Sequence, residues 1–266
     1  MIGWRNMKTV NSTLHKFSLE GRTALVTGGN RGLGLAIAAA LYDAGATLVI
    51  TARDEAQLAK AKADLLKRGT GVVHTISAEL TDDASVTRLY DSVHALVDNV
   101  DILINNAGVN RRGPAENLTE DDWHYVLQTD LTVPFLVART FARPMLQRGW
   151  GRILNVGSIF GQVAFGHRVP YGAAKAGIIH MSKVMAVEWA TRGVTVNALC
   201  PGPFATEMNK VVMDDPEQYQ RFVGNIPMAR WGNLEEIGAP ALLLCSDAGS
   251  FITGTTLTVD GGWTAQ

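Results

Sequence analysis

This sequence of 266 residues has only two cysteines, no long apolar run and a net charge close to zero. Its two cysteines, Cys200 and Cys245, lie in the apolar stretches VNALC and ALLLC. We therefore expect reduced, buried thiols in a cytoplasmic protein, with no disulfide framework and no metal site. No apolar run reaches the ~18 residues of a membrane-spanning helix. The 24 basic and 25 acidic residues nearly cancel, which gives no indication of a nucleic-acid or membrane partner.

The chain is long enough to bury a sizeable core, and 47% of its residues are hydrophobic. Its first stretch, MIGWRNMKTVNSTLHKF, is polar and lacks the apolar segment of a secretory signal. We therefore expect a loosely held arm over residues 1–17 and one α/β domain over residues 18–266.

Short β-branched runs alternate with helical stretches along this domain. Strands rich in Val, Ile and Leu that are each followed by a helix indicate parallel pairing, with helices on both faces of the sheet. The pattern predicts a doubly wound, Rossmann-type fold with a seven-stranded parallel sheet. The strands are expected at residues 23–27, 47–51, 72–77, 101–106, 152–158, 194–199 and 256–260.

One segment, residues 203–231, breaks the alternation directly after the sixth predicted strand. Ligands of open parallel sheets bind beyond the carboxyl ends of the strands. A long insertion at this place predicts a lid over a bound substrate, with an ordinary surface excursion as the alternative.

A glycine-rich turn, TGGNRGLG, joins the first predicted strand to the first helix. Gly28, Gly32 and Gly34 are spaced G-x-x-x-G-x-G. Glycines at such a turn let a pyrophosphate approach the amide groups at the helix N-terminus, where the helix dipole favours an anion. The turn predicts dinucleotide binding, although glycine clusters also serve packing alone.

Tyr171 and Lys175 lie one turn apart on the otherwise small and apolar stretch 169–189. Helical spacing places both side chains on one face. A free tyrosine has a pKa of ~10, too high for easy proton exchange near neutral pH. A cation ~4 Å away at an effective dielectric of ~20 contributes about 4 kcal/mol, which could lower that pKa by up to ~3 units. The pair suits proton transfer, but a core-edge tyrosine beside a lysine that reaches to water has the same pattern.

Taken together, these motifs are similar to those of the short-chain dehydrogenase/reductase family, in its short single-domain form. The resemblance covers about residues 18–263. It is carried by TGGNRGLG, Asn105-Asn106-Ala107-Gly108, Ser158, Tyr171-x-x-x-Lys175, Pro201-Gly202 with Thr206, and FITGTTLTVDGG.

The resemblance implies an oxidoreductase that interconverts a ketone and a secondary alcohol. It makes Tyr171 the general acid/base, with Lys175 lowering its pKa and holding the nicotinamide ribose, and Ser158 hydrogen-bonding the substrate oxygen. The implied cofactor contacts are Gly28, Asn30, Arg31, Gly32, Leu33, Gly34, Arg53, Glu79, Leu80, Asn106, Ala107, Gly108, Tyr171, Lys175, Pro201, Gly202 and Thr206.

Asp130 departs from the family pattern, which usually has asparagine at this place. In the family this residue supports a water chain that leads from the lysine, partly through its backbone carbonyl. An ionised Asp130 near Lys175 would counter the effect of the lysine on the tyrosine. We therefore count Asp130 with the catalytic residues and expect a functional but altered proton relay.

The end of the second predicted strand indicates which nicotinamide is bound. Family members that prefer NAD generally carry an acidic residue there, but Ala52 stands at that position and Arg53 follows it. Arg31, inside the glycine turn, is a second nearby cation. Guanidinium groups suit a 2′-phosphate, so the sequence predicts NADP(H) in preference to NAD(H).

The stretches around Arg111-Arg112 and residues 201–232 resemble the gluconate 5-dehydrogenase branch of the family, which implies a keto sugar acid or polyol as substrate. The 3-oxoacyl carrier-protein reductases share nearly all the same motifs, and a reductase of bulkier ketones is a further alternative. We expect the substrate to contact Ser158, Phe160, His167 and Phe204.

Two expectations concern assembly and activity. By resemblance, a long helix over residues 119–148 and the Tyr171 helix should pack against other subunits in a homotetramer. A catalytically silent nucleotide sensor is the alternative from another functional class, but none of the residues whose loss would mark such a protein is missing.

Overall fold

The structure is a computed structural model that describes residues 13–266. Most of the predicted arm, residues 1–12, lies outside the described residues, and Thr13–Phe17 form a 3₁₀ helix. In the described part, no helix is both long and apolar enough to cross a bilayer.

Seven parallel strands form one sheet in the order β3-β2-β1-β4-β5-β6-β7. The predicted fold class is therefore confirmed. Every residue of β4, β5 and β6 is buried, as expected for strands that helices cover on both faces. The strands are β1 Thr23–Thr27, β2 Thr47–Ala52, β3 Val73–Ser77, β4 Ile102–Asn105, β5 Gly151–Val156, β6 Val194–Pro201 and β7 Thr256–Val259.

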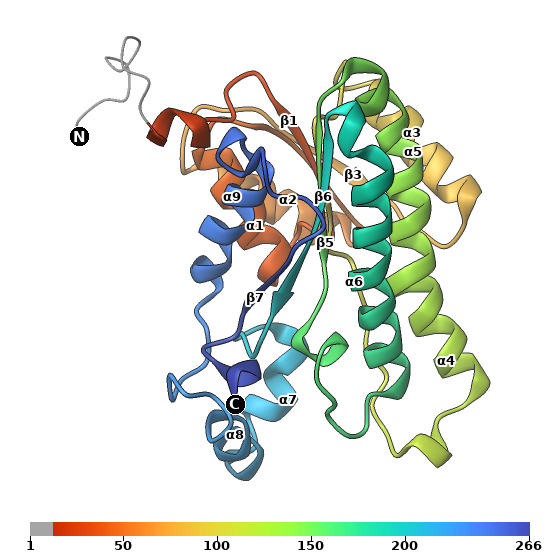
Figure 1. The fold of residues 1–266 in the computed structure, drawn as a ribbon, viewed down its shortest axis with the longest axis vertical. Helices are drawn as coiled ribbons and strands as arrows, with labels where there is room; N and C mark the ends of the chain where they lie inside the picture. The colour runs from red at the N-terminus through yellow and green to blue at the C-terminus, as the bar shows by residue number, and fades with distance from the viewer. Residues whose placement is uncertain (1–12) are drawn as a thin grey trace.

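Helices cover the sheet in two layers (Figure 1). One layer contains α1 (Gly32–Asp43), α2 (Glu55–Leu66) and α9 (Gly238–Cys245). The other contains α3 (Asp83–His94), α5 (Val133–Arg148) and α6 (Val169–Trp189). Each layer encloses its own apolar cluster against the sheet.

Side-chain caps set where several of these helices begin. The carboxylate of Asp54 accepts the amide of Gln57 at the start of α2, and Asp82 forms a capping box with Ser85 at the start of α3. Thr119 does the same with Asp122 at the start of α4 (Glu120–Leu127). Gly149, with φ of 73°, ends α5 in the left-handed conformation that glycine adopts without strain.

The helix predicted as continuous over 119–148 is interrupted. A π-helical turn, Gln128–Thr132, separates α4 from α5. Pro134 has no amide hydrogen, so it cannot close the α-helical bond to the carbonyl of Asp130, four residues earlier. Val133 instead donates to Gln128, five residues back, and the helix widens at Asp130.

The predicted lid segment, 203–231, carries its own short helices beyond the carboxyl ends of the strands (Figure 1). These are η7 (Glu207–Asn209), α7 (Lys210–Met213) and α8 (Pro216–Val223). Helices α7 and α8 contribute side chains to a third apolar cluster, which includes Ile159, Val212, Phe222, Ile226, Trp231 and Trp263.

A buried polar network ties the centre of the sheet to α6. Asn105 donates through Nδ2 to Asn155 Oδ1 at 2.9 Å, and Asn155 donates to Ser182 Oγ at 2.9 Å. Asn155 and Ser182 are wholly buried. Buried polar groups need their partners, since water cannot replace them.

We expect Asn155→Ala to lower the free energy of unfolding by about 1–3 kcal/mol, because it leaves the Asn105 amide and the Ser182 hydroxyl each short of a partner. Urea unfolding at neutral pH measures the change. The matched control is Asn117→Ala, since Asn117 is exposed, and it should change stability by less than about 0.5 kcal/mol. Equal effects of the two substitutions would contradict the role of the network.

Candidate active site

A cleft of about 800 Å³ opens where the strands end, between the glycine turn, α6 and the lid segment. It brings together all the predicted cofactor and catalytic residues, and Phe160 and Phe204 among the predicted substrate contacts. His167 does not line it: its side chain is exposed and its φ is 65°. Within residues 13–266, no group of three or more His, Cys, Asp or Glu residues is placed to hold a metal ion.

The glycine turn forms a backbone cradle at the start of α1. Gly28 and Gly32 have φ of 64° and 55°, which glycine adopts without strain. Arg31 makes no side-chain cap, so the first amide groups of α1 have no side-chain acceptor at that position. A helix N-terminus of this kind binds phosphate groups through its amides and dipole. The turn therefore fits the pyrophosphate of a dinucleotide.

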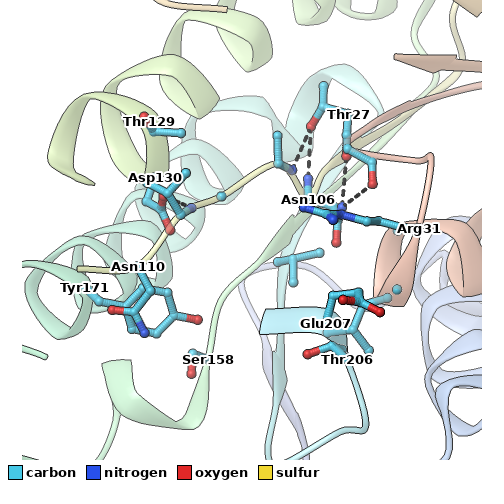
Figure 2. A pocket seen from close by; sticks show the side chains of 18 of the residues that line it. Thr27, Arg31, Asn106, Asn110, Thr129, Asp130, Ser158, Tyr171, Thr206 and Glu207 are labelled. Atoms are coloured by element: carbon cyan, nitrogen blue, oxygen red, sulfur yellow. Dashed lines mark hydrogen bonds between the residues drawn. The ribbon is translucent and has the colours of Figure 1, made fainter. Parts of the chain in front are cut away.

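Asn106 locks this turn to the end of β4 (Figure 2). Its Nδ2 donates to the carbonyls of Thr27 and Gly28, each at 3.0 Å, and its amide donates to Thr27 Oγ1 at 3.0 Å. A Cβ on Gly34 would lie 2.3 Å from Asn106 Nδ2 and from the Gly28 carbonyl. The glycine at position 34 is thus required by close packing, whereas Gly32 is required by its conformation.

The end of β2 carries the residues that bear on cofactor choice. Arg53 and Glu79 form an ion pair at 3.4 Å, with both side chains about two thirds exposed, at 64% and 65%. Arg31 is exposed on the same cleft. No sequence motif indicated this ion pair. In it, the Glu79 carboxylate competes with a cofactor phosphate for the Arg53 guanidinium.

Lys175 lies at the centre of the site and is buried. Its Nζ donates to the Val156 carbonyl at 3.0 Å, lies 3.2 Å from Asp130 Oδ2, and lies 5.5 Å from the centroid of the Tyr171 ring. The predicted proximity of the ammonium and the phenol ring is present, and the ammonium also meets a carboxylate.

The π-helical turn brings Asp130 to this position. The side chain of Asp130 is wholly buried, and its Oδ1 accepts the amide of Val109 at 2.7 Å. A Cβ on Gly108 would lie 2.9 Å from Asp130 Oδ2, so the carboxylate also packs closely on the strand end. Figure 2 shows Asp130, Asn110, Tyr171 and Ser158 on one side of the cleft, with Arg31 and Thr206 on the other.

The two buried charges act on each other. Burial raises the pKa of Asp130, and the nearby Lys175 ammonium only partly offsets this. Burial opposes the charge of Lys175, but the combined effects of Asp130, Tyr171 and Cys200 outweigh it, so the pKa of Lys175 is raised. Each partner therefore holds its proton more tightly than it would in water.

Ser158 lies two residues beyond the end of β5 and is buried. Its hydroxyl accepts a hydrogen bond from the backbone amide of Phe160 at 3.2 Å. This bond caps the start of the short 3₁₀ helix Ile159–Gly161. This bond fixes the serine side chain at the cleft while its hydrogen is left for another acceptor.

Beyond Tyr171 the cleft is lined by rings and guanidinium groups. Arg111 pairs with Asp122 at 3.3 Å and stacks over Tyr125, whereas Arg112 donates to Asn209 Oδ1 at 3.3 Å. Arg168, which was not among the predicted site residues, also lines the cleft. No local motif marks Arg168; only its place three residues before Tyr171 could have pointed to it.

We expect the stability of an Asp130→Asn variant to rise relative to the parent as pH increases above the ordinary aspartate pKa of 3.8. The raised pKa means that, above 3.8, the folded state binds more protons than the unfolded state. The parent therefore loses stability as pH rises through the raised pKa, and asparagine does not titrate.

Urea unfolding of the parent and the variant at pH 4.5, 6 and 7.5 measures this difference. Asp121→Asn on α4 is the matched control, because Asp121 is exposed. Parallel pH dependence in parent and Asp130→Asn would contradict the assignment.

Comparison with known proteins identifies the family of this chain. Residues 28–264 match a family model described as enoyl-(acyl carrier protein) reductase. The 3-oxoacyl-[acyl-carrier-protein] reductase FabG of Aquifex aeolicus is 38% identical over 248 residues, which is 93% of this chain and 99% of that protein. Gluconate 5-dehydrogenase of Gluconobacter oxydans is 38% identical over 254 residues, covering 94% of this chain and 97% of that protein.

Solved structures of similar fold support the same family. A gluconate 5-dehydrogenase from Burkholderia cenocepacia, in complex with NADP and tartrate, superposes with a TM-score of 0.91 at 37% identity, covering 96% of this chain and all of that one. Levodione reductase has a TM-score of 0.89 at 30% identity, covering 93% and 99%. With matches over nearly its whole length, this chain belongs to the short-chain dehydrogenase/reductase family of oxidoreductases.

Proposed function

We propose that this protein interconverts a ketone and a secondary alcohol with NADP(H), and that Tyr171 exchanges the proton. The observation that carries the proposal is the position of Lys175, whose ammonium lies 5.5 Å from the Tyr171 ring centroid and is fixed by the Val156 carbonyl. When bound, the reduced nicotinamide supplies the hydride that reaches the carbonyl carbon.

The chain's own residues handle the oxygen and its proton. Ser158 orients the carbonyl oxygen by a hydrogen bond, and the Tyr171 hydroxyl gives its proton to that oxygen as the alcohol forms. The Lys175 ammonium stabilises the phenolate that is left behind. The Asp130 carboxylate lies 3.2 Å from the Lys175 ammonium. We therefore propose that the proton which restores Tyr171 is relayed through this carboxylate or through the backbone carbonyl of Asp130 in the π-helical turn.

Tyr171→Phe removes the proton donor, and we expect it to lower kcat for ketone reduction by roughly 10²- to 10⁴-fold. Nicotinamide absorbance measures kcat, and quenching of protein fluorescence measures NADPH binding, which should be retained. Tyr90→Phe on α3 is the matched control, since Tyr90 packs against His94 and lies outside the cleft. Full turnover by Tyr171→Phe would refute the assignment.

NADP(H) is the proposed cofactor in preference to NAD(H). Ala52 ends β2 where a carboxylate would exclude a 2′-phosphate, and Arg31 and Arg53 line the cleft there. Structural relatives with bound NADP support the same choice. Glu79 works against it, because its carboxylate already pairs with Arg53.

The proposal predicts opposite effects of two substitutions on the ratio of kcat/KM for NADPH to that for NADH. Arg53→Ala should lower this ratio by about 10-fold, the lower end for a charged hydrogen bond because Arg53 is largely exposed. Glu79→Gln should raise the ratio by roughly 2- to 5-fold, because it frees Arg53 for the phosphate. Changes of the same sign in both variants, or none, would refute a 2′-phosphate site at Arg53.

For the substrate we propose a keto sugar acid or the corresponding polyol. The 38% identity to a gluconate 5-dehydrogenase and the tartrate in a related complex support this class. The second candidate is a 3-oxoacyl thioester, since a 3-oxoacyl carrier-protein reductase is equally similar. Comparing keto sugar acids, acetoacetyl thioesters and cyclic ketones as substrates separates the candidates. The preferred class should exceed the others in kcat/KM.

A homotetramer in the cytoplasm remains our proposal for the working form of the protein. Phe135 on α5 and Val184 and Val187 on α6 are exposed apolar side chains on the helices expected to meet other subunits. Their burial in an assembly would remove apolar surface from water.

A further inference from the structure

Arg168 is a buried cation at the substrate end of the cleft. It stands directly before α6, three residues ahead of Tyr171, and is 7% exposed. Its Nη1 donates to the Gly166 carbonyl at 3.1 Å. Among residues 13–266 no carboxylate forms an ion pair with it. A guanidinium carries five N–H donors, so most of its bonding capacity remains for something in the cleft.

Aromatic rings surround this guanidinium. Its Cζ lies 5.0 Å from the ring centroid of Phe160, 4.6 Å from that of Phe165 and 5.8 Å from that of Phe222. Ring faces attract a cation but offer no strong acceptor to its N–H groups. Phe222 belongs to α8 of the lid segment, so the guanidinium joins the wall of the cleft to the lid.

A second guanidinium lies nearby. Arg112 lines the same cleft, and its charge acts on Arg168. Burial, with a smaller effect from Arg112, lowers the pKa of Arg168 to about 10. Arg112 is exposed, whereas Arg168 is buried. Burying the Arg168 charge beside a like charge is unfavourable, and a bound anion would offset that cost.

We infer that Arg168, together with Arg112, binds an anionic carboxylate of the substrate, while Phe160 and Phe222, which line the cleft, pack on its carbon chain. The inference rests on the proposed function and specifies its substrate as a keto or hydroxy acid whose carboxylate is remote from the reacting carbonyl. Arg168 is then a residue that determines specificity and takes no part in the proton transfer.

A purely structural role makes a different prediction. If Arg168 only holds the aromatic wall and the lid in place, its loss weakens the binding of charged and uncharged compounds alike. If it binds a carboxylate, its loss weakens the binding of anions selectively. Pairs of compounds that differ only in charge therefore separate the two roles.

Direct binding tests the site without turnover. Tartrate is the probe, and threitol is its uncharged counterpart with the same carbon chain. We expect Arg168→Met to raise the Kd of tartrate by about 10- to 100-fold, with Arg168→Lys intermediate and with no change for threitol. Tryptophan fluorescence reports binding, because Trp263 packs against Phe165 and Trp231 against Phe222.

Arg221→Met is the matched control. Arg221 also lies over the Phe165 ring, at 5.8 Å, but it is exposed and does not line the cleft. This variant should bind tartrate as the parent does. Failure of the parent to bind tartrate, or an unchanged Kd in Arg168→Met, would overturn the inference.

Turnover gives the second test, in which a keto sugar acid such as 5-ketogluconate is compared with its methyl ester. The catalytic efficiency for the acid relative to that for the ester should fall by about 10- to 100-fold in Arg168→Met. Equal losses for acid and ester would overturn the inference and leave Arg168 a structural residue. If the parent reduces no ketone at all, the proposed function fails, and the tartrate titration still decides whether Arg168 binds an anion.

Discussion

The placement of one buried ammonium governs the site. Lys175 reaches the interior from α6, donates to the carbonyl of Val156 at the end of β5, and meets the carboxylate of Asp130 in the π-helical turn. Three elements that lie apart in the sequence must therefore converge around the ammonium, because an unpaired buried charge is very unfavourable. The Tyr171 ring lies beside the same ammonium, with its centroid 5.5 Å from Nζ, and both residues line the cleft.

The rest of the cleft follows from the parallel sheet. All strands deliver their carboxyl ends to one edge, so the glycine turn after β1, the Asn106 loop after β4 and Ser158 after β5 meet there. The bonds from Asn106 to Thr27 and Gly28 hold the glycine turn against the end of β4. Over it lies the lid segment, whose aromatic residues pack with Ile159 and Trp263 into a separate cluster.

Much of this was predictable from local pattern. Each of the seven predicted ranges overlaps an observed strand, because buried β-branched runs have few alternatives, and the glycine spacing marked the cradle at α1. The π-helical turn was missed, although Pro134 was its signal in an otherwise helical stretch. The Arg53–Glu79 pair and the ring-lined setting of Arg168 depend on where distant side chains meet, and His167, with its positive φ, turns out to solvent while the next residue turns inward. Such directions are set by tertiary packing and not by sequence spacing.

In the proposed reaction, a hydride reaches a carbonyl carbon beside Tyr171 and the ammonium of Lys175. The most direct measurement is a single turnover of a keto acid with NADPH that carries deuterium on one face of nicotinamide C4, followed by mass analysis and NMR of the alcohol. The proposed hydride transfer predicts deuterium on the new carbinol carbon from one of the two stereospecifically labelled cofactors and none from the other. Consumption of NADPH with no label in the alcohol from either cofactor would contradict it.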